Sequence, residues 1–146
     1  TEATVGCIIY DVKDAQETVL IGKPIANTQI YILDEFLNPC AIGVIGELYI
    51  SGNGLATGYS NREDLTKEKF ISNPFREDAL MYKTGDLGKW LADGNIDYTG
   101  RIDDQVKIRG YRIELGELEN SLSNIPQISQ SVVAVKEDKG EKYLVA

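Results

Sequence analysis

Residues 100–119 read GRIDDQVKIRGYRIELGELE, and this stretch says more about the fold than any other part of the chain. Its centre is the pair Arg109-Gly110, with short alternating runs at 105–108 and 111–115 on either side. Since glycine readily adopts the positive φ of a tight turn, this pattern predicts a β-hairpin. The stretch then leads into a helix predicted over 117–124, with leucines spaced to form one apolar stripe.

The residues before this stretch are typical of short strands joined by turns. Asp93-Gly94-Asn95 between two apolar runs predicts a second hairpin, and a further turn is expected at Gly85-Asp86. The run GELYIS places Leu48 on one face of a strand and Tyr49 on the other. Strands are predicted over residues 5–10, 29–33, 46–51, 81–84, 89–91 and 96–99.

One short helix is expected in the same region, over residues 61–70. Asn61 is the predicted N-cap, because its side chain can accept a hydrogen bond from a free backbone N–H of the first turn. Asp64 then falls at the third helical position, and Lys67 and Lys69 fall near the end. Acidic residues at the start and basic residues at the end suit the helix dipole.

Charge and turn patterns indicate a boundary near residue 103, beside the carboxylates Asp103 and Asp104. We expect an α+β chain: a β-rich, distorted barrel-like segment over 1–102, then a hinge and a small α+β lobe over 103–146. In the second part a buried strand is predicted over 131–135 and a strand that the chain end truncates over 143–146.

Composition narrows the class of protein. The chain has 146 residues, 42% hydrophobic and 26% charged, with a net charge of −8. An acidic chain is poorly suited to nucleic acid, because phosphate contacts need basic surface. The chain has no histidine, only two cysteines, Cys7 and Cys40, and no apolar run of about 18 residues. We therefore expect no nucleic-acid partner, no membrane span and a cytoplasmic location.

Four segments, in order, resemble motifs of the adenylation domains of nonribosomal peptide synthetases, which are AMP-forming adenylating enzymes. Thr1-Glu2 is similar to the end of the motif YGPTE, and GELYISGNGLATGY at 46–59 is similar to GELxIxGxGLARGY. YKTGDL at 82–87 and the stretch at 100–119 match two further motifs. The resemblance covers the whole chain, and the twenty-residue motif is the most specific part of it.

The resemblance implies a nucleotide site for ATP and AMP. The residue matching the family's ribose-binding aspartate is Asp86, although a carboxylate after Thr-Gly is also typical of an Asx turn. Tyr98 matches an aromatic residue that contacts the nucleotide, and it could equally be a core or a cross-strand aromatic. Arg101 matches a residue that donates hydrogen bonds to phosphate or ribose, and its alternative is a surface ion pair with Asp103.

Other matches concern metal, hinge and partner. Thr1 and Glu2 correspond to a phosphate contact and a Mg²⁺ ligand, and the alternative is a disordered terminus. Asp103 matches the hinge about which the small lobe swings between two reactions. Lys107 lies in a hairpin presented to the phosphopantetheine arm of a carrier domain, and it is predicted to contact phosphate; the alternative is a solvated basic hairpin.

Taken together, these features predict a piece of an enzyme that forms an aminoacyl-adenylate from an amino acid and ATP. The aminoacyl group then passes to a carrier thiol. The family's phosphate loop, amino-acid pocket and late lysine do not occur in these residues, so no complete catalytic set is present and the piece alone is expected to be inactive. Two alternatives remain: an acyl-CoA synthetase, and a non-catalytic β-rich binding module.

Overall fold

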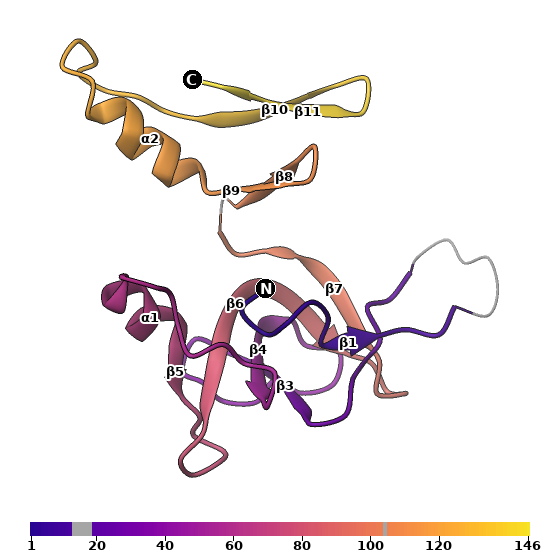
Figure 1. Ribbon diagram of the computed structural model, residues 1–146. Helices are drawn as coiled ribbons and strands as arrows, with labels where there is room; N and C mark the ends of the chain where they lie inside the picture. Colours follow the sequence, from indigo (N-terminus) through magenta and orange to yellow (C-terminus); the bar gives the residue numbers. More distant parts are fainter. Residues whose placement is uncertain (13–18, 104) are drawn as a thin grey trace. The chain divides into compact units, whose positions relative to one another are not determined.

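The computed structural model describes residues 1–12, 19–103 and 105–146, so Asp104 lies outside the described residues. The chain divides into two compact units, Thr1–Ile102 and Asp103–Ala146. The strands and helices, in chain order, are β1 Ile8–Ile9, β2 Lys23–Pro24, β3 Thr28–Leu33, β4 Gly46–Gly52, α1 Glu63–Lys69, β5 Phe70–Ser72, β6 Leu80–Trp90, β7 Ile96–Arg101, β8 Val106–Ile108, β9 Tyr111–Ile113, α2 Leu115–Ser123, β10 Ala134–Asp138 and β11 Glu141–Val145 (Figure 1).

The main part of the first unit is an antiparallel sheet of five strands, accompanied by the two-stranded sheet β1-β2 and helix α1. The order of the five-stranded sheet is β3-β4-β6-β5, and β7 also pairs with β6. The central strand β6 bends strongly along its length, which curls the sheet (Figure 1). This agrees with the expected distorted barrel-like segment, and with two helices among the described residues the structure is mostly β.

Apolar side chains pack against this sheet in two clusters. The first contains buried Leu48 and Ile96, whereas the second contains buried Tyr49 and Met81. Because side chains alternate along a strand, the neighbours Leu48 and Tyr49 enter different clusters, as the GELYIS pattern predicts. The other buried members are Ile30 and Ile32 in the first cluster and Leu33 in the second.

The turn predicted at residues 85–86 is wrong, because β6 continues through it. On either side of this point Glu47 pairs with Leu87, and Tyr49 pairs with Lys83. Between those pairs β4 contributes one residue and β6 contributes three, so β6 carries a bulge. Gly85, with a φ of 76°, bends the strand at this bulge without reversing its direction.

The hairpin predicted at 93–95 is confirmed, with Trp90 opposite Ile96. Further along, the β6–β7 register shifts by one residue: Gly88 pairs with Tyr98, but Leu87 pairs with Gly100. This second irregularity decides which side chains face each other at the far end of β7.

Helix α1 begins later than the sequence predicts. Its N-cap is Arg62 and makes no side-chain capping hydrogen bond, while Asn61 has a left-handed φ of 56°. Thr66 ties the turn together instead, since its Oγ1 accepts a bond from Tyr59 N at 2.9 Å and donates to Arg62 O at 2.8 Å. Asparagine tolerates left-handed backbone, so Asn61 serves the preceding turn rather than the cap.

The strand predicted over 5–10 is only partly present, since β1 contains just Ile8 and Ile9, paired with Pro24 and Lys23. Val5 is fully exposed in the structure. A β-branched composition alone does not form a strand where no partner strand lies alongside.

The second unit contains two hairpins and a helix. The predicted hairpin at β8–β9 is confirmed, with positive φ at both Arg109 (49°) and Gly110 (85°). Helix α2 begins at Leu115, two residues before the predicted start, and ends at Ser123. The strand predicted over 131–135 is displaced and exposed: β10 begins at Ala134 and pairs with β11 along its length.

Candidate functional site

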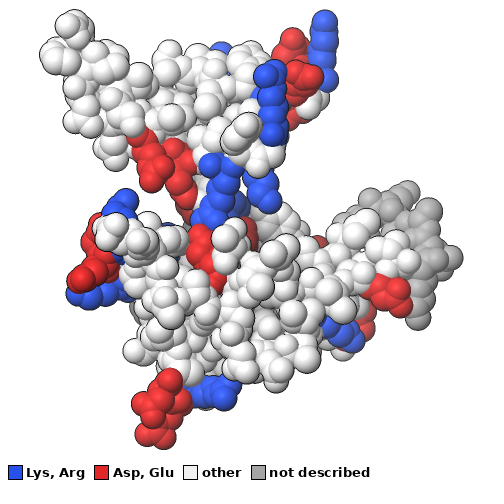
Figure 2. Space-filling view, viewed as in Figure 1, with Lys and Arg blue, Asp and Glu red and all other residues white. Residues whose placement is uncertain are grey.

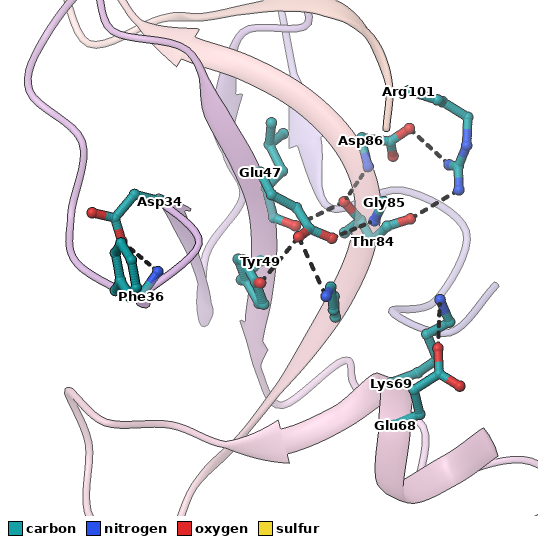
Figure 3. Close-up of polar contacts among 12 residues, drawn as sticks. Asp34, Phe36, Glu47, Tyr49, Glu68, Lys69, Thr84, Gly85, Asp86 and Arg101 are labelled. Carbon is teal, nitrogen blue, oxygen red and sulfur yellow. Dashed lines mark hydrogen bonds and ion pairs between the residues drawn. The ribbon is translucent and has the colours of Figure 1, made fainter. Parts of the chain in front are cut away.

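The side chains of Asp86 and Arg101 meet across strands β6 and β7. They are paired residues in the ladder, and the Arg101 Nη1–Asp86 Oδ1 distance is 2.8 Å (Figure 3). Arg101 Nη2 also donates to the Thr84 carbonyl at 3.1 Å. The side chains of Asp86 and Arg101 are 35% and 20% exposed, so both reach the surface while remaining held.

The bulge that carries Asp86 is held by side-chain hydrogen bonds in place of the interrupted ladder (Figure 3). Thr84 Oγ1 donates to the Leu48 carbonyl at 2.7 Å and accepts from Asp86 N at 2.9 Å. Gly85 N donates to Glu47 Oε1 at 3.1 Å. Backbone N–H groups that lose their strand partner need such acceptors, so the Thr-Gly-Asp sequence is satisfied locally.

Glu47 is a buried carboxylate in the next strand, β4. Besides Gly85 N, it accepts a hydrogen bond from Tyr49 Oη at 3.1 Å and lies 3.7 Å from Lys83 Nζ. Burial, together with the Glu47 charge, raises the pKa of Tyr49 well above its ordinary value of 10.0, so the phenol stays protonated and donates.

Glu2 is held by contacts with residues of the 46–59 motif, whereas Thr1 is exposed. The Glu2 carbonyl accepts a bond from Ala56 N at 2.8 Å, and Glu2 Oε1 accepts from Tyr59 Oη at 2.9 Å. Glu2 Oε2 lies 3.4 Å from the amino group of Thr1. Burial is the main cause that raises the pKa of Tyr59 far above 10.0, with bonds to Tyr82 and Glu2 adding to it.

Cys7 is partly buried. Burial raises the pKa of its thiol, and the charge of Asp86 makes a smaller contribution in the same direction.

The remaining predicted residues have the following positions. Tyr98 lies on β7, is 44% exposed, and is therefore not a core residue. Asp103 is the first residue of the second unit, and its Oδ1 accepts a bond from Gln105 N at 3.3 Å. Lys107 is exposed on β8, opposite Arg112.

Sequence reasoning assigned no role to Glu47, Thr84 or Tyr59, although all three lie inside the motifs that it used. A polar residue in an otherwise apolar strand, such as Glu47 in GELYIS, is the pattern that could have revealed the first. Its partner is 38 positions away, so only strand pairing identifies what it holds.

Among residues 1–12, 19–103 and 105–146, no group of three or more His, Cys, Asp and Glu could hold a metal ion. In the same described residues, no helix has the length and apolarity to span a membrane. Red and blue side chains lie next to one another within each unit, without one extended basic patch among the described residues in this view (Figure 2).

Comparison with known proteins identifies the class. The family model described as "AMP-binding enzyme" matches residues 1–60. Tyrocidine synthase 3 of Brevibacillus parabrevis is 52% identical over 150 residues, which cover 100% of this chain and 2% of that protein. The chain thus spans a small part of its curated relatives.

Solved structures agree. A nonribosomal peptide synthetase protein containing adenylation and PCP domains superposes with a TM-score of 0.83 at 35% identity, over 99% of this chain and 30% of the other. A four-domain nonribosomal peptide synthetase bound to AMP and glycine gives 0.65 at 43% identity, over 98% of this chain and 11% of the other. The chain belongs to the AMP-binding enzymes, as a segment of the nonribosomal peptide synthetase adenylation type.

Proposed function

We propose that this segment holds the nucleotide in an enzyme that activates an amino acid for nonribosomal peptide synthesis. The reaction joins the amino acid carboxylate to the α-phosphate of ATP, releasing pyrophosphate, and the aminoacyl group then passes to the thiol of a carrier domain. Membership of the AMP-binding family implies ATP as the nucleotide. The observation that carries the proposal is the Asp86–Arg101 pair, with a carboxylate and a guanidinium side by side at 2.8 Å.

The chemistry of this pair fits an adenosine nucleotide. A carboxylate accepts both hydrogen bonds of a vicinal ribose diol, and a guanidinium donates in fork geometry to phosphate or ribose oxygens. In this structure Arg101 fills one acceptor position of Asp86. The ribose hydroxyls take that position, and Arg101 turns its donors toward the nucleotide. Tyr98, exposed on the same strand, supplies a flat apolar surface for the adenine.

Glu2 is the proposed Mg²⁺ ligand, with Thr1 as a phosphate contact. A single carboxylate is compatible with Mg²⁺, which binds through one or two carboxylates and takes its other ligands from substrate phosphates and water. Tyr59 holds one oxygen of Glu2 and thereby orients the other. The ion neutralises phosphate charge when ATP is bound.

The second unit is proposed to be the start of the small lobe, with Asp103 as the hinge. Ile102 N donates to Gly85 O at 2.9 Å, which is the last strand-like anchor before the boundary. A hinge needs a few residues that absorb backbone rotation, and Asp103 follows that anchor directly. Lys107, exposed on β8, is proposed to meet a phosphate of the phosphopantetheine arm.

The test is amino-acid-dependent ATP–pyrophosphate exchange with the full-length enzyme that contains this segment. We expect exchange with one or a few amino acids, and at least a tenfold higher KM for ATP after Asp86→Ala, because each lost hydrogen bond to a charged group weakens binding by about that factor. Asp78→Ala, which removes an exposed carboxylate on a surface turn, is the matched control.

Exchange that is insensitive to Asp86→Ala would refute the assignment of the nucleotide site. Absence of exchange with any amino acid, combined with thioester formation from a carboxylic acid and free coenzyme A, would indicate an acyl-CoA synthetase instead. Neither activity would leave only the non-catalytic binding module.

A further inference from the structure

The position of Asp86 depends on a bulge that β6 cannot maintain alone. Between the Glu47–Leu87 and Tyr49–Lys83 pairs, three residues of β6 face one residue of β4. Flattening the strand would change the register and turn the Asp86 side chain away from its present direction. The direction of the ribose-binding carboxylate therefore rests on whatever stabilises the bulge.

We propose that Glu47 is a positioning residue for nucleotide binding, because its buried carboxylate holds the bulge that presents Asp86. The proposal rests on the proposed function, since it concerns the same nucleotide site. Glu47 acts through the backbone: its Oε1 accepts from Gly85 N at 3.1 Å, one residue before Asp86.

Burial makes this contact informative. The Glu47 side chain is only 9% exposed, and an ionised carboxylate in such a place needs donors around it. Tyr49 Oη and Gly85 N provide two, and Lys83 Nζ adds a partly exposed positive charge. An apolar residue at position 47 would need no hydrogen-bond donors around it. It would, however, leave the Gly85 N–H without this acceptor.

Thr84, on β6 itself, also stabilises the bulge. Its hydroxyl donates to the Leu48 carbonyl and accepts from Asp86 N, so β4 holds the bulge through both a side chain and a backbone group. Two contacts from one strand, on consecutive β6 residues, fix the backbone just before Asp86. Loss of either contact lets Asp86 reorient.

The experiment measures exchange kinetics of the full-length enzyme with Glu47→Ala, Glu47→Gln, Asp86→Ala and the double variant Glu47→Ala/Asp86→Ala. Glu47→Ala is expected to raise the KM for ATP about tenfold and to leave the KM for the amino acid unchanged. Glu47→Gln keeps an amide oxygen for Gly85 N, so it should stay within about threefold of the unsubstituted enzyme. In the double variant, Glu47→Ala should add nothing to the effect of Asp86→Ala.

Asp97→Ala is the matched control. Asp97 is another partly buried carboxylate of this sheet, but it pairs with Lys89 at 3.4 Å and not with the bulge. Its loss should leave both KM values unchanged. If Glu47→Ala does not fold, Thr84→Val replaces the hydroxyl by a methyl group of similar size and should show the same ATP-selective effect.

Equal effects of Glu47→Ala on both KM values, or full additivity with Asp86→Ala, would overturn the positioning role. A proposed function that fails is recognised separately, by the absence of exchange in the unsubstituted enzyme. In that case AMP binding by calorimetry decides the inference: weaker binding in Glu47→Ala supports it, and equal binding rejects it.

Discussion

Replacing Gly85 by alanine tests whether the bent backbone of β6 serves nucleotide binding. Gly85 has φ of 76°, and an L-residue in this left-handed region costs about 1–2 kcal/mol. The strand can avoid that strain by flattening, which breaks the Gly85–Glu47 and Asp86–Thr84 bonds. We expect the strand to flatten, which moves Asp86 away from the ribose.

The expected magnitudes follow from these contacts. Strain of about 1–2 kcal/mol lowers the unfolding midpoint by a few degrees, at about 2–4 °C per kcal/mol for a domain of ordinary size. Loss of the ribose contact, a hydrogen bond to a charged group worth about 1.5–3 kcal/mol, raises the KM for ATP about 10- to 100-fold. The assays are thermal unfolding and ATP–pyrophosphate exchange of the full-length enzyme.

Gly43 provides a matched control, because its φ is 83° and a Cβ there meets no atom within 4 Å. Gly43→Ala therefore has a similar backbone strain in an exposed loop. It should lower the unfolding midpoint comparably and leave the KM for ATP unchanged. If both alanine variants alter the KM for ATP equally, or neither does, the link between the bulge and the nucleotide is wrong.

Three further outcomes are expected. Ile96→Ala removes a fully buried side chain and should lower the free energy of unfolding by about 2–5 kcal/mol in denaturant titration, whereas Ile42→Ala, at a 66% exposed position, should change it little. Because the pKa of Tyr49 is raised in the folded state, the contribution of the neutral phenol to stability is complete below pH 10 and is lost as pH rises above that value. Tyr49→Phe should therefore make the free energy of unfolding fall less steeply with pH above pH 10. An unchanged slope would contradict this. Arg109→Ala breaks an ion pair whose side chains are 80% and 81% exposed, so circular dichroism melting should show no change.

Local sequence predicted the parts of the fold that depend on local chemistry. The turns at 93–95 and 109–110 are set by glycine and its neighbours, whose backbone preferences act within a few residues. The alternation in GELYIS likewise predicted the two faces of β4. The predicted helix start was wrong by only one residue. Asn61 adopts left-handed backbone in the preceding turn, and the Thr66 side chain makes the hydrogen bond that stabilises the start of the helix.

The sequence by itself determined the family, the two hairpins and the identity of the nucleotide-site candidates, because motif residues and turn chemistry are local properties. Only the tertiary structure decided that Gly85-Asp86 is a bulge rather than a turn, since that depends on β4 alongside. It also decided that Asp86 faces Arg101 and that Glu47 accepts a hydrogen bond from Gly85 N. Those contacts join residues 15 to 38 positions apart, and strand register, which local preferences leave open, brings them together.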